Sequence, residues 1–503
     1  MMAAQQFQPE TRLSALLGSI IVLPTQHDPV ITGVVLDSRK VRPGDLFLAL
    51  CGTLSDGREF IDAAIEKGAV AVAWESPVGA QIEIRRRIPL IPVPNLRQYA
   101  GEIAARFYAN PSAAMQVIGI TGTNGKTSCS HFLAQALGDT SSVGVIGTLG
   151  NGLFGALQKS GNTTPDPVTL QLLLAQFRDQ GTSRTVMEVS SHALEQGRVQ
   201  GVDFDIALFT NLSRDHLDYH GSMVSYAAAK RRLFNMPGLR TAVINADDEF
   251  GRELLGSLPG GVRACGYTLE QRNDAALMVT GTDLRLSPKG LQMEVRTPWG
   301  SSTLESSLLG RFNASNLLAV LTVLLMLDVP LNRAVARLAQ LTPVPGRMEA
   351  FGGSGVPLVV VDYAHTPDAL EQVLIALQGH GKRLWCVFGC GGDRDRGKRA
   401  LMGAAAGQYA DHVVITDDNP RSEEPEAITA DILAGIPGYI DVEVCHDRAT
   451  AIAGVIRQAS VQDVVLVAGK GHEQFQQIGD LKRPFSDRDV VRDTLAEWSV
   501  HNG

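Results

Sequence analysis

Residues 117–128 read VIGITGTNGKTS, an apolar run that leads into a glycine-rich segment, and a helix-like stretch follows over 129–137. Strand, loop and helix in this order predict a phosphate-binding loop, because glycines let backbone N–H groups close around phosphate oxygens. In such a loop Lys126 reaches the terminal phosphates and the Thr127 hydroxyl can bind magnesium. Ile120 stands where the usual Gly-x-x-x-x-Gly-Lys pattern has glycine, so the loop is a shortened variant. ATP binding is the prediction, and an accidental glycine-rich turn is the alternative.

Strand-like and helix-like stretches alternate on both sides of this loop. Buried-strand patterns at 185–189, 206–209 and 242–244 predict a mainly parallel sheet covered on both faces, with a strand-rich insertion or edge near 266–304. Residues 31–74 follow the pattern strand, turn, strand, helix, strand. The fold class is therefore α/β.

Three domains are expected, because 503 residues exceed what one hydrophobic core usually holds. The expected bounds are 1–110 for a small N-terminal α/β domain, 111–342 for a central phosphate-loop ATPase-like parallel-sheet domain, and 343–503 for a C-terminal Rossmann-like domain. The last boundary rests on the Pro- and Gly-rich segment 343–346, after which strands and helices alternate again.

Composition restricts the class of partner and the compartment. The net charge is −8 and basic residues are scattered, which argues against nucleic-acid binding. Six cysteines without C-x-x-C spacing argue against a disulfide scaffold and a zinc site. Apolar runs are too short to span a bilayer, and no secretion signal opens the chain. We therefore expect a cytoplasmic protein, monomeric, without membrane insertion.

Five further segments accompany the loop, and they are NTTPD (162–166), EVSSHAL (188–194), TNLSRDHLDYHGS (210–222), GRFNASN (310–316) and PGRME (345–349). Together they resemble the Mur ligase family over nearly the whole chain. With DSR (37–39) and DNPR (418–421), the resemblance is closest to the members that add diaminopimelate. It implies an ATP-dependent ligase that joins meso-2,6-diaminopimelate to the D-glutamyl side-chain carboxylate of UDP-N-acetylmuramoyl-L-alanyl-D-glutamate, in peptidoglycan precursor synthesis.

The implied reaction passes through an acyl phosphate, which the amine attacks before phosphate leaves. The resemblance implies Lys126, Glu188, His216 and Lys230 as catalytic residues, and Thr127, Glu188, His216 and a carbamylated Lys230 as Mg²⁺ ligands. Taken singly, these residues have plainer interpretations. Glu188 can cap the following helix, His216 can be a loop hydrogen-bonding residue, and Lys230 can be a solvated charge on the helix-like stretch 224–234.

The resemblance also implies two binding sets. The ATP set is Thr121, Gly122, Thr123, Asn124, Gly125, Lys126, Thr127, Asn313, Asn316, Arg347 and Asp362. The set for the UDP-linked dipeptide is Leu36, Ser38, Thr53, Leu54, Ser55, Asn162, Thr163, Thr164, Ser190, Gln196 and Arg198. Asn313 and Asn316 share one helix face, so their amides can reach adenine or each other, and a helix cap at Asn313 is the alternative. Singly, the neutral residues of the second set fit plain loop and cap hydrogen bonding.

The amino-acid site is expected at the carboxyl ends of two strands in the last third of the chain. Its residues are Arg394, Asp418, Asn419, Pro420, Arg421, Gly469 and Glu473. Arg421 is the discriminating residue, because a guanidinium pairs well with the second carboxylate that diaminopimelate has and lysine lacks. A surface ion pair of Arg421 with Glu423 or Glu424 is the alternative.

Two other functions stay open at this point. A lysine-adding Mur ligase or a folylpolyglutamate synthetase-like ligase would share the loop and the amide chemistry. A scaffold that binds ATP without catalysis would be expected to have lost Lys126, Glu188 or Lys230, and all three are present.

Overall fold

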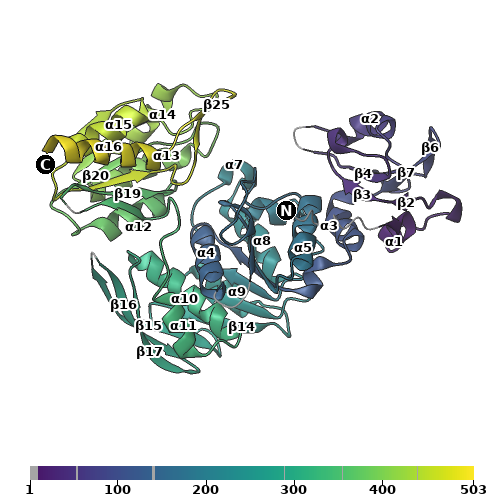
Figure 1. Ribbon diagram of the computed structural model, residues 1–503, viewed down its shortest axis with the longest axis horizontal. Helices are drawn as coiled ribbons and strands as arrows, with labels where there is room; N and C mark the ends of the chain where they lie inside the picture. The colour runs from purple at the N-terminus through teal and green to yellow at the C-terminus, as the bar shows by residue number, and fades with distance from the viewer. Residues whose placement is uncertain are drawn as a thin grey trace. The chain divides into compact units, whose positions relative to one another are not determined.

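Figure 1 shows the computed structural model of the chain, which describes residues 10–52, 55–138, 142–287, 289–353, 355–438 and 440–502. The chain divides into two compact units. The first comprises Met1–Thr121, Leu137–Ala207 and Arg232–Arg240, and the second comprises Gly122–Ala136, Leu208–Arg231 and Thr241–Gly503. The mixed helices and parallel strands confirm the predicted α/β class.

The first unit begins with a five-stranded sheet in the order β3-β4-β5-β7-β6. Its strands are β3 (Gly33–Val35), β4 (Asp45–Ala49), β5 (Ala71–Glu75), β6 (Glu83–Arg85) and β7 (Ile88–Val93), and only β6 pairs antiparallel. Strand β4 is buried throughout, and successive residues point to opposite faces. Leu46 and Leu48 pack with helices α1 (Leu13–Leu17) and α3 (Leu96–Phe107), while Phe47 packs with α2 (Ile61–Glu66).

Four more strands of the first unit follow in the order β10-β9-β11-β8. They are β8 (Gln116–Thr121), β9 (Val143–Gly147), β10 (Gly150–Leu153) and β11 (Arg184–Glu188). Helix α5 (Pro167–Asp179) precedes β11 in the chain, and α6 (Ser191–Glu195) follows it. Strands β8 and β11 are parallel, and Glu188 lies opposite Ile120. The carboxyl end of β11 therefore lies beside the strand that leads into the glycine-rich loop.

In the second unit, strands β13 (Thr241–Asn245), β14 (Arg263–Thr268) and β15 (Met278–Ser287) pair in parallel, and β16 (Gly290–Thr297) and β17 (Gly300–Ser306) continue as an antiparallel meander. This meander is the strand-rich edge expected near 266–304. Helix α10 (Arg311–Met326) is buried over almost its whole length, because its sequence is apolar after the first turn. Helices α9 (Glu249–Gly256) and α11 (Leu331–Leu338) complete this part.

The C-terminal part of the second unit contains a six-stranded sheet in the order β18-β19-β23-β20-β21-β22. Its strands are β18 (Glu349–Gly352), β19 (Leu358–Asp362), β20 (Leu384–Phe388), β21 (His412–Ile415), β22 (Val442–Val444) and β23 (Val464–Ala468), and only β18 is antiparallel. One face packs against α12 (Pro367–Leu377), α13 (Gly397–Tyr409) and α14 (Pro425–Leu433), and the other against α15 (Arg448–Gln458) and α16 (Asp487–Asn502). This is the doubly wound unit that the sequence predicts.

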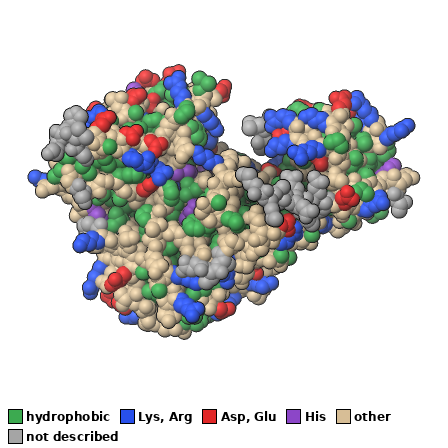
Figure 2. Space-filling model, viewed as in Figure 1, with side chains coloured by type: hydrophobic (Ala, Val, Ile, Leu, Met, Phe, Trp, Pro, Cys, Tyr) green, Lys and Arg blue, Asp and Glu red, His purple; other side chains and the backbone are tan. Residues whose placement is uncertain are grey.

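Charged side chains of both signs lie on the surface of the molecule. Basic and acidic side chains are interspersed over the face shown in Figure 2. Among the described residues, no helix combines the length and the apolar character needed to cross a membrane.

A fully buried ion pair ties α15 to the start of α16. Arg448 Nε and Nη2 donate to the two carboxylate oxygens of Asp487 at 2.7 and 2.8 Å, and both side chains are 0% exposed. Arg448→Met leaves a buried carboxylate without its partner, so we expect a loss of about 3–5 kcal/mol in unfolding free energy. Urea-induced unfolding, monitored through hydrogen exchange of the amides in α15 and α16, measures this loss in unfolding free energy.

The matched control for this prediction is Arg457→Met in the same helix. Arg457 pairs with Glu497 at 2.9 Å, but both side chains are about 60% exposed, and such pairs contribute roughly 0–1 kcal/mol. Equal losses in the two variants would show that burial of the Arg448 pair does not determine its contribution.

Candidate active site

The glycine-rich loop lies between β8 and α4 (Lys126–Leu137) as predicted. Gly122 has a φ of +154°, and a Cβ there would lie 1.8 Å from Thr210 Oγ1, so only glycine fits. Two hydrogen bonds hold the loop backbone in place. Thr123 N donates to Asn211 O at 2.8 Å, and the Thr210 side chain donates through Oγ1 to Asn124 O at 2.6 Å. Lys126 Nζ folds back onto the loop and donates to the carbonyls of Gly122 and Thr123 at 2.7 and 2.8 Å.

A cavity of about 460 Å³ opens beside this loop in the second unit. The predicted ATP residues that line it are Asn124, Gly125, Asn313, Asn316, Arg347 and Asp362. The other predicted ATP residues are not among the lining residues. They are Thr121 at the end of β8, Gly122 and Thr123 of the loop, and Lys126 and Thr127 at the start of α4. Sequence reasoning missed other lining residues, which include Phe132, Asn245, Asp247, Asp248, Glu270, Phe312 and Asp368. Phe312 lies within the GRFNASN segment, whereas the other missed residues come from outside the motifs quoted above.

The two asparagines of α10 contact each other. Asn316 Nδ2 donates to Asn313 Oδ1 at 3.3 Å, and Asn313 Nδ2 donates to Leu309 O at 2.8 Å. The capping alternative for Asn313 is wrong, because Gly310 occupies the cap position and Asn313 lies inside the helix. Both amides are buried and belong to residues that line the cavity.

Arg347 and Asp362 come from the start of the C-terminal part. Arg347 Nη2 donates to Thr127 Oγ1 at 3.3 Å, and its guanidinium lies 4.3 Å from the centre of the Tyr363 ring. Asp362 Oδ2 accepts from Met348 N at 2.7 Å, and burial raises the pKa of Asp362. Arg347 therefore joins the segment after the Pro- and Gly-rich stretch directly to the phosphate loop.

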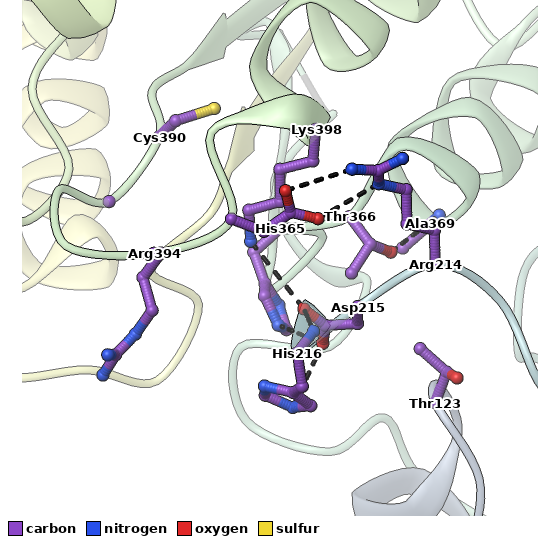
Figure 3. A network of polar contacts seen from close by, with 12 residues as sticks. Thr123, Arg214, Asp215, His216, His365, Thr366, Ala369, Cys390, Arg394 and Lys398 are labelled. Carbon is purple, nitrogen blue, oxygen red and sulfur yellow. Dashed lines mark hydrogen bonds and ion pairs between the residues drawn. The ribbon is translucent and has the colours of Figure 1, made fainter. Parts of the chain in front are cut away.

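The side chains of two histidines and one lysine converge on Asp215, which is 5% exposed. Figure 3 shows His216, His365 and Lys398 turned toward it, with nitrogens 3.2, 3.7 and 4.0 Å from its carboxylate oxygens. Burial opposes the ionisation of Asp215, but its bond to His365 and the nearby charges outweigh burial and lower its pKa. The neighbouring Arg214 pairs with Asp395 at 3.1 Å, so two successive residues of the SRDH segment contact the C-terminal part.

His365 and Lys398 are functional candidates that the sequence did not reveal. His365 contacts Tyr363 O through Nδ1 at 2.8 Å and Asp215 through Nε2. Lys398 is 6% exposed, and its ammonium has no hydrogen-bond partner among the residues that the structure describes. Only the chain fold brings these residues to Asp215, so no local pattern marks them.

Lys230 is buried against the phosphate loop. Its side chain is 1% exposed, its Nζ donates to Gly122 O at 2.7 Å, and Nζ lies 4.4 Å from the centre of the Tyr226 ring. Burial, reinforced by the charge of Lys126, lowers the pKa of Lys230 well below its ordinary value. The interpretation of Lys230 as a solvated charge is therefore wrong.

Glu188 lies in the first unit at the end of β11 and is 0% exposed. Its two carboxylate oxygens accept from Thr148 N and Thr148 Oγ1 at 2.9 and 3.0 Å. It does not cap the next helix, because Ser190 Oγ accepts from Ala193 N at that position. The capping alternative for Glu188 is therefore wrong, and metal binding stays a prediction.

The fit of a magnesium ion depends on the chemistry of the predicted ligands. Across the described ranges, no three His, Cys, Asp or Glu side chains form a cluster that could hold a metal ion. Thr127 offers a hydroxyl and Glu188 a carboxylate, which are ligands that Mg²⁺ accepts. Lys230 as an ammonium cannot bind a cation, whereas a carbamate on the same nitrogen is anionic. Lys230 could therefore serve as a magnesium ligand only in its carbamylated form.

The residues predicted for the UDP-linked dipeptide all belong to the first unit. Arg198 connects three of them, because its Nη1 donates to Thr164 O and its Nε to Gln196 Oε1, both at 2.9 Å, while Ser190 Oγ accepts from Thr164 at 3.3 Å. Thr163 lies beside Thr148, and Asn162 is exposed. Of the N-terminal residues, Leu36 and Ser38 are half-buried and Ser55 is exposed, whereas Thr53 and Leu54 lie outside the described residues.

The predicted amino-acid residues meet where β21 and β23 end. Asn419 Nδ2 donates to Glu473 Oε2 at 3.0 Å, and a Cβ at Gly469 would lie 2.7 Å from Asp418 Oδ2. Arg394 is exposed on the loop before α13, and Pro420 is buried. The two strand ends therefore converge, as expected from a parallel sheet.

Arg421 is held by the hairpin of β24 (Phe475–Ile478) and β25 (Leu481–Pro484). Its N donates to Gln477 O at 3.2 Å, its O accepts from Gly479 N at 2.7 Å, and its Nη1 donates to Gly392 O at 2.6 Å. The ion-pair alternative is wrong for Glu423, which pairs with Arg399 at 2.8 Å. Burial and the nearby Arg394 charge lower the pKa of Arg421.

Comparisons with known proteins cover almost the entire chain. Residues 30–108 match the catalytic domain model of the Mur ligase family, residues 120–324 its middle domain, and residues 346–471 its glutamate ligase domain. The UDP-N-acetylmuramoyl-L-alanyl-D-glutamate–2,6-diaminopimelate ligase of Chromobacterium violaceum is 51% identical over 496 residues, which cover 97% of this chain and 99% of that protein.

Solved structures give the same result. A UDP-N-acetylmuramoyl-L-alanyl-D-glutamate–2,6-diaminopimelate ligase superposes with a TM-score of 0.70 at 39% identity, covering 97% of this chain and 99% of that one. The MurF ligase of Thermotoga maritima, solved in complex with ADP, shares the fold with a TM-score of 0.62 at 19% identity, covering 96% of this chain and 100% of that one. The resemblance seen in the motifs is confirmed, and the chain belongs to the Mur ligase family.

Proposed function

We propose that this Mur ligase uses ATP to add meso-2,6-diaminopimelate to the D-glutamyl side-chain carboxylate of UDP-N-acetylmuramoyl-L-alanyl-D-glutamate. The observation that carries the proposal is the placement of Arg421 and Glu473 after the converging ends of β21 and β23. One offers a guanidinium and the other a carboxylate, which suit the carboxylate and ammonium at the far end of diaminopimelate. The name of the Chromobacterium violaceum relative supports the same substrates.

The first step transfers the γ-phosphoryl group of ATP to the substrate carboxylate. A carboxylate oxygen forms the new P–O bond, the bond to the β-phosphate oxygen breaks, and ADP leaves. Lys126 and the backbone N–H groups of the loop hold the phosphates, and Arg347, already bonded to Thr127 Oγ1, adds a second cation. Asn313, Asn316 and Asp362 line the cavity for the nucleoside.

The second step forms the amide. The neutral amine of diaminopimelate attacks the acyl phosphate carbonyl, phosphate leaves with the bonding electrons, and the nitrogen loses a proton. Thr127, Glu188, His216 and a carbamylated Lys230 are the proposed ligands of Mg²⁺, which when bound neutralises the charge on the phosphates. Asp215 fixes the ring of His216 through its contact with Nε2.

The remaining assignments belong to the same proposal. The set from Leu36 to Arg198 given above would bind the UDP-linked dipeptide, and Arg394, Asp418, Asn419, Pro420 and Gly469 would complete the amino-acid site. The domains would span 1–110, 111–342 and 343–503. We infer a monomer that acts in the cytoplasm, where peptidoglycan precursors and ATP are available.

One experiment tests the reaction. The protein is incubated with ATP, Mg²⁺, the UDP-linked dipeptide and either meso-diaminopimelate or lysine, and the product masses are measured. We expect the mass increase of one diaminopimelate less one water. A product with lysine alone would indicate a lysine-adding ligase, and no product with either amine would refute the proposal. Folylpolyglutamate synthetase-like activity is tested with a folate and glutamate in parallel.

Arg421→Ala should raise KM for diaminopimelate by about 100-fold or more, because a lost charge-assisted contact costs roughly 2–5 kcal/mol. KM for ATP should change less than about threefold, since the variant leaves the nucleotide cavity intact. The control is Arg483→Ala on the exposed strand β25 of the same hairpin, for which both constants should stay near those of the unaltered protein. Equal changes in the two constants of Arg421→Ala would refute the assignment.

A further inference from the structure

Lys470 is a fully buried lysine in the middle of the amino-acid site. It is 0% exposed and follows directly after β23 and Gly469. Its Nζ donates to Asn419 Oδ1 at 3.0 Å and to Glu473 Oε2 at 2.9 Å, and it lies 3.9 Å from Asp418 Oδ1. Burying an ammonium costs several kcal/mol unless it is well paired, so this arrangement requires an explanation.

The hydrogen bonds determine which polar atoms of Asn419 and Glu473 already have a partner. Asn419 Oδ1 accepts from Lys470 Nζ and from Gln477 N at 2.8 Å, so its Nδ2 must face Glu473 Oε2, to which it donates at 3.0 Å. Glu473 Oε2 therefore accepts two bonds. Within the described part of the chain, Glu473 Oε1 accepts none, and the side chain is 20% exposed.

The same site contains a guanidinium that Glu473 can reach electrostatically. The charges of Asp418 and Glu473 both act on Arg421, whose only side-chain bond among the described residues joins Nη1 to Gly392 O. A carboxylate and a guanidinium in the same site favour pairing with each other, because their geometries match. Such a pair would occupy both groups and leave nothing for the substrate.

We propose that Lys470 is the positioning residue that keeps Glu473 and Arg421 apart. This inference rests on the proposed function. Lys470 and Asn419 bind Oε2 and hold the Glu473 carboxylate in place, so Oε1 stays available for the substrate ammonium while the Arg421 fork stays available for its carboxylate. The site thus presents two separated opposite charges, which select an amino acid whose far end has both an ammonium and a carboxylate.

Lys470→Met tests the inference, because methionine keeps most of the volume and removes the charge. We expect KM for diaminopimelate to rise roughly 30-fold, as expected for losing bonds to a charged group. KM for ATP and for the UDP-linked dipeptide should change less than about twofold, since a positioning residue of the amino-acid site affects one substrate. Lys482→Met on β25 is the control, because Lys482 is exposed and its Nζ lies 4.7 Å from the centre of the Phe475 ring.

A second background separates positioning from a structural effect. If Lys470 acts through Glu473, then Lys470→Met should raise KM for diaminopimelate much less in Glu473→Gln protein than in unaltered protein. The double variant also removes both charges of the pair, so it is measurable if Lys470→Met alone does not fold. Additive effects, or equal rises for all three substrates, would overturn the inference. The unaltered protein is assayed first by product mass, so its inactivity would refute the proposed function instead.

Discussion

Replacing Lys126 by alanine is expected to lower kcat by about 10²–10³-fold or more, the range found when one preorganised cationic or hydrogen-bonding group is removed from a charge-developing transition state. In the structure, Lys126 Nζ donates to the carbonyls of Gly122 and Thr123. A bound triphosphate would replace these neutral acceptors with anionic ones, so the lysine interacts most strongly when charge moves between phosphates. Phosphate release with all three substrates present measures the loss.

Lys126→Arg is the informative companion. It keeps the charge but replaces a compact ammonium by a broad planar group, which the narrow loop beside Gly122 does not fit. We expect it to stay at least about tenfold below the unaltered protein, since the geometry of a contact to the transition state matters as much as its charge. Retention of more than a tenth of kcat in Lys126→Ala, with an unchanged circular dichroism spectrum, would remove Lys126 from the phosphoryl-transfer step.

The phosphate loop and the parallel sheets were predictable because local physics determines them. Glycine at 122 is forced by the close approach of Thr210, and buried parallel strands appear in the sequence as short apolar runs such as 464–467. Parallel strands also place their carboxyl ends at one edge, and so the meeting of Asn419 and Glu473 follows from the strand assignments alone.

The burial of Lys230 was in principle readable. Tyr226, Ala229, Lys230 and Leu233 follow the spacing of one helix face, and all four are buried. The neighbouring arginines made this pattern hard to recognise, because a run of three basic residues is typical of a solvated surface. The charge of Lys230 alone therefore predicts an exposed side chain, whereas its position on the helix face predicts a buried one.

The contacts of Asp215 were not predictable in this way. His365 and Lys398 lie about 150 and 180 residues away in the chain, so their approach depends on how the two sheets of the second unit fold together. The hairpin that holds Arg421 was also missed, since its strands β24 and β25 are short, half polar and contain no buried residue. Neither feature leaves a periodic pattern in the sequence.

Lys230→Met is expected to reduce kcat by about 10²–10³-fold, the loss of a group that stabilises transition-state charge. Burial lowers the pKa of this amine well below its ordinary value, which favours the neutral form, and only a neutral amine attacks carbon dioxide to form a carbamate. Nζ forms a bond to the carbon, the electrons of one C=O π bond move to oxygen, and the nitrogen loses a proton, so the neutral amine becomes an anionic carbamate. Labelling with ¹³C-bicarbonate should give a carbamate resonance in the unaltered protein and none in the variant.

The next residue in the helix supplies the control that separates carbamylation from a general charge effect. Arg231 is 31% exposed and pairs with Glu253 at 3.1 Å, so Arg231→Met should keep both the activity and the ¹³C signal. Removing carbon dioxide from the unaltered protein should lower its activity, and bicarbonate should restore it, whereas Lys230→Met should respond to neither. If the unaltered protein keeps full activity without the ¹³C resonance, Lys230 acts as an amine. The Lys230 carbamate is then not a magnesium ligand.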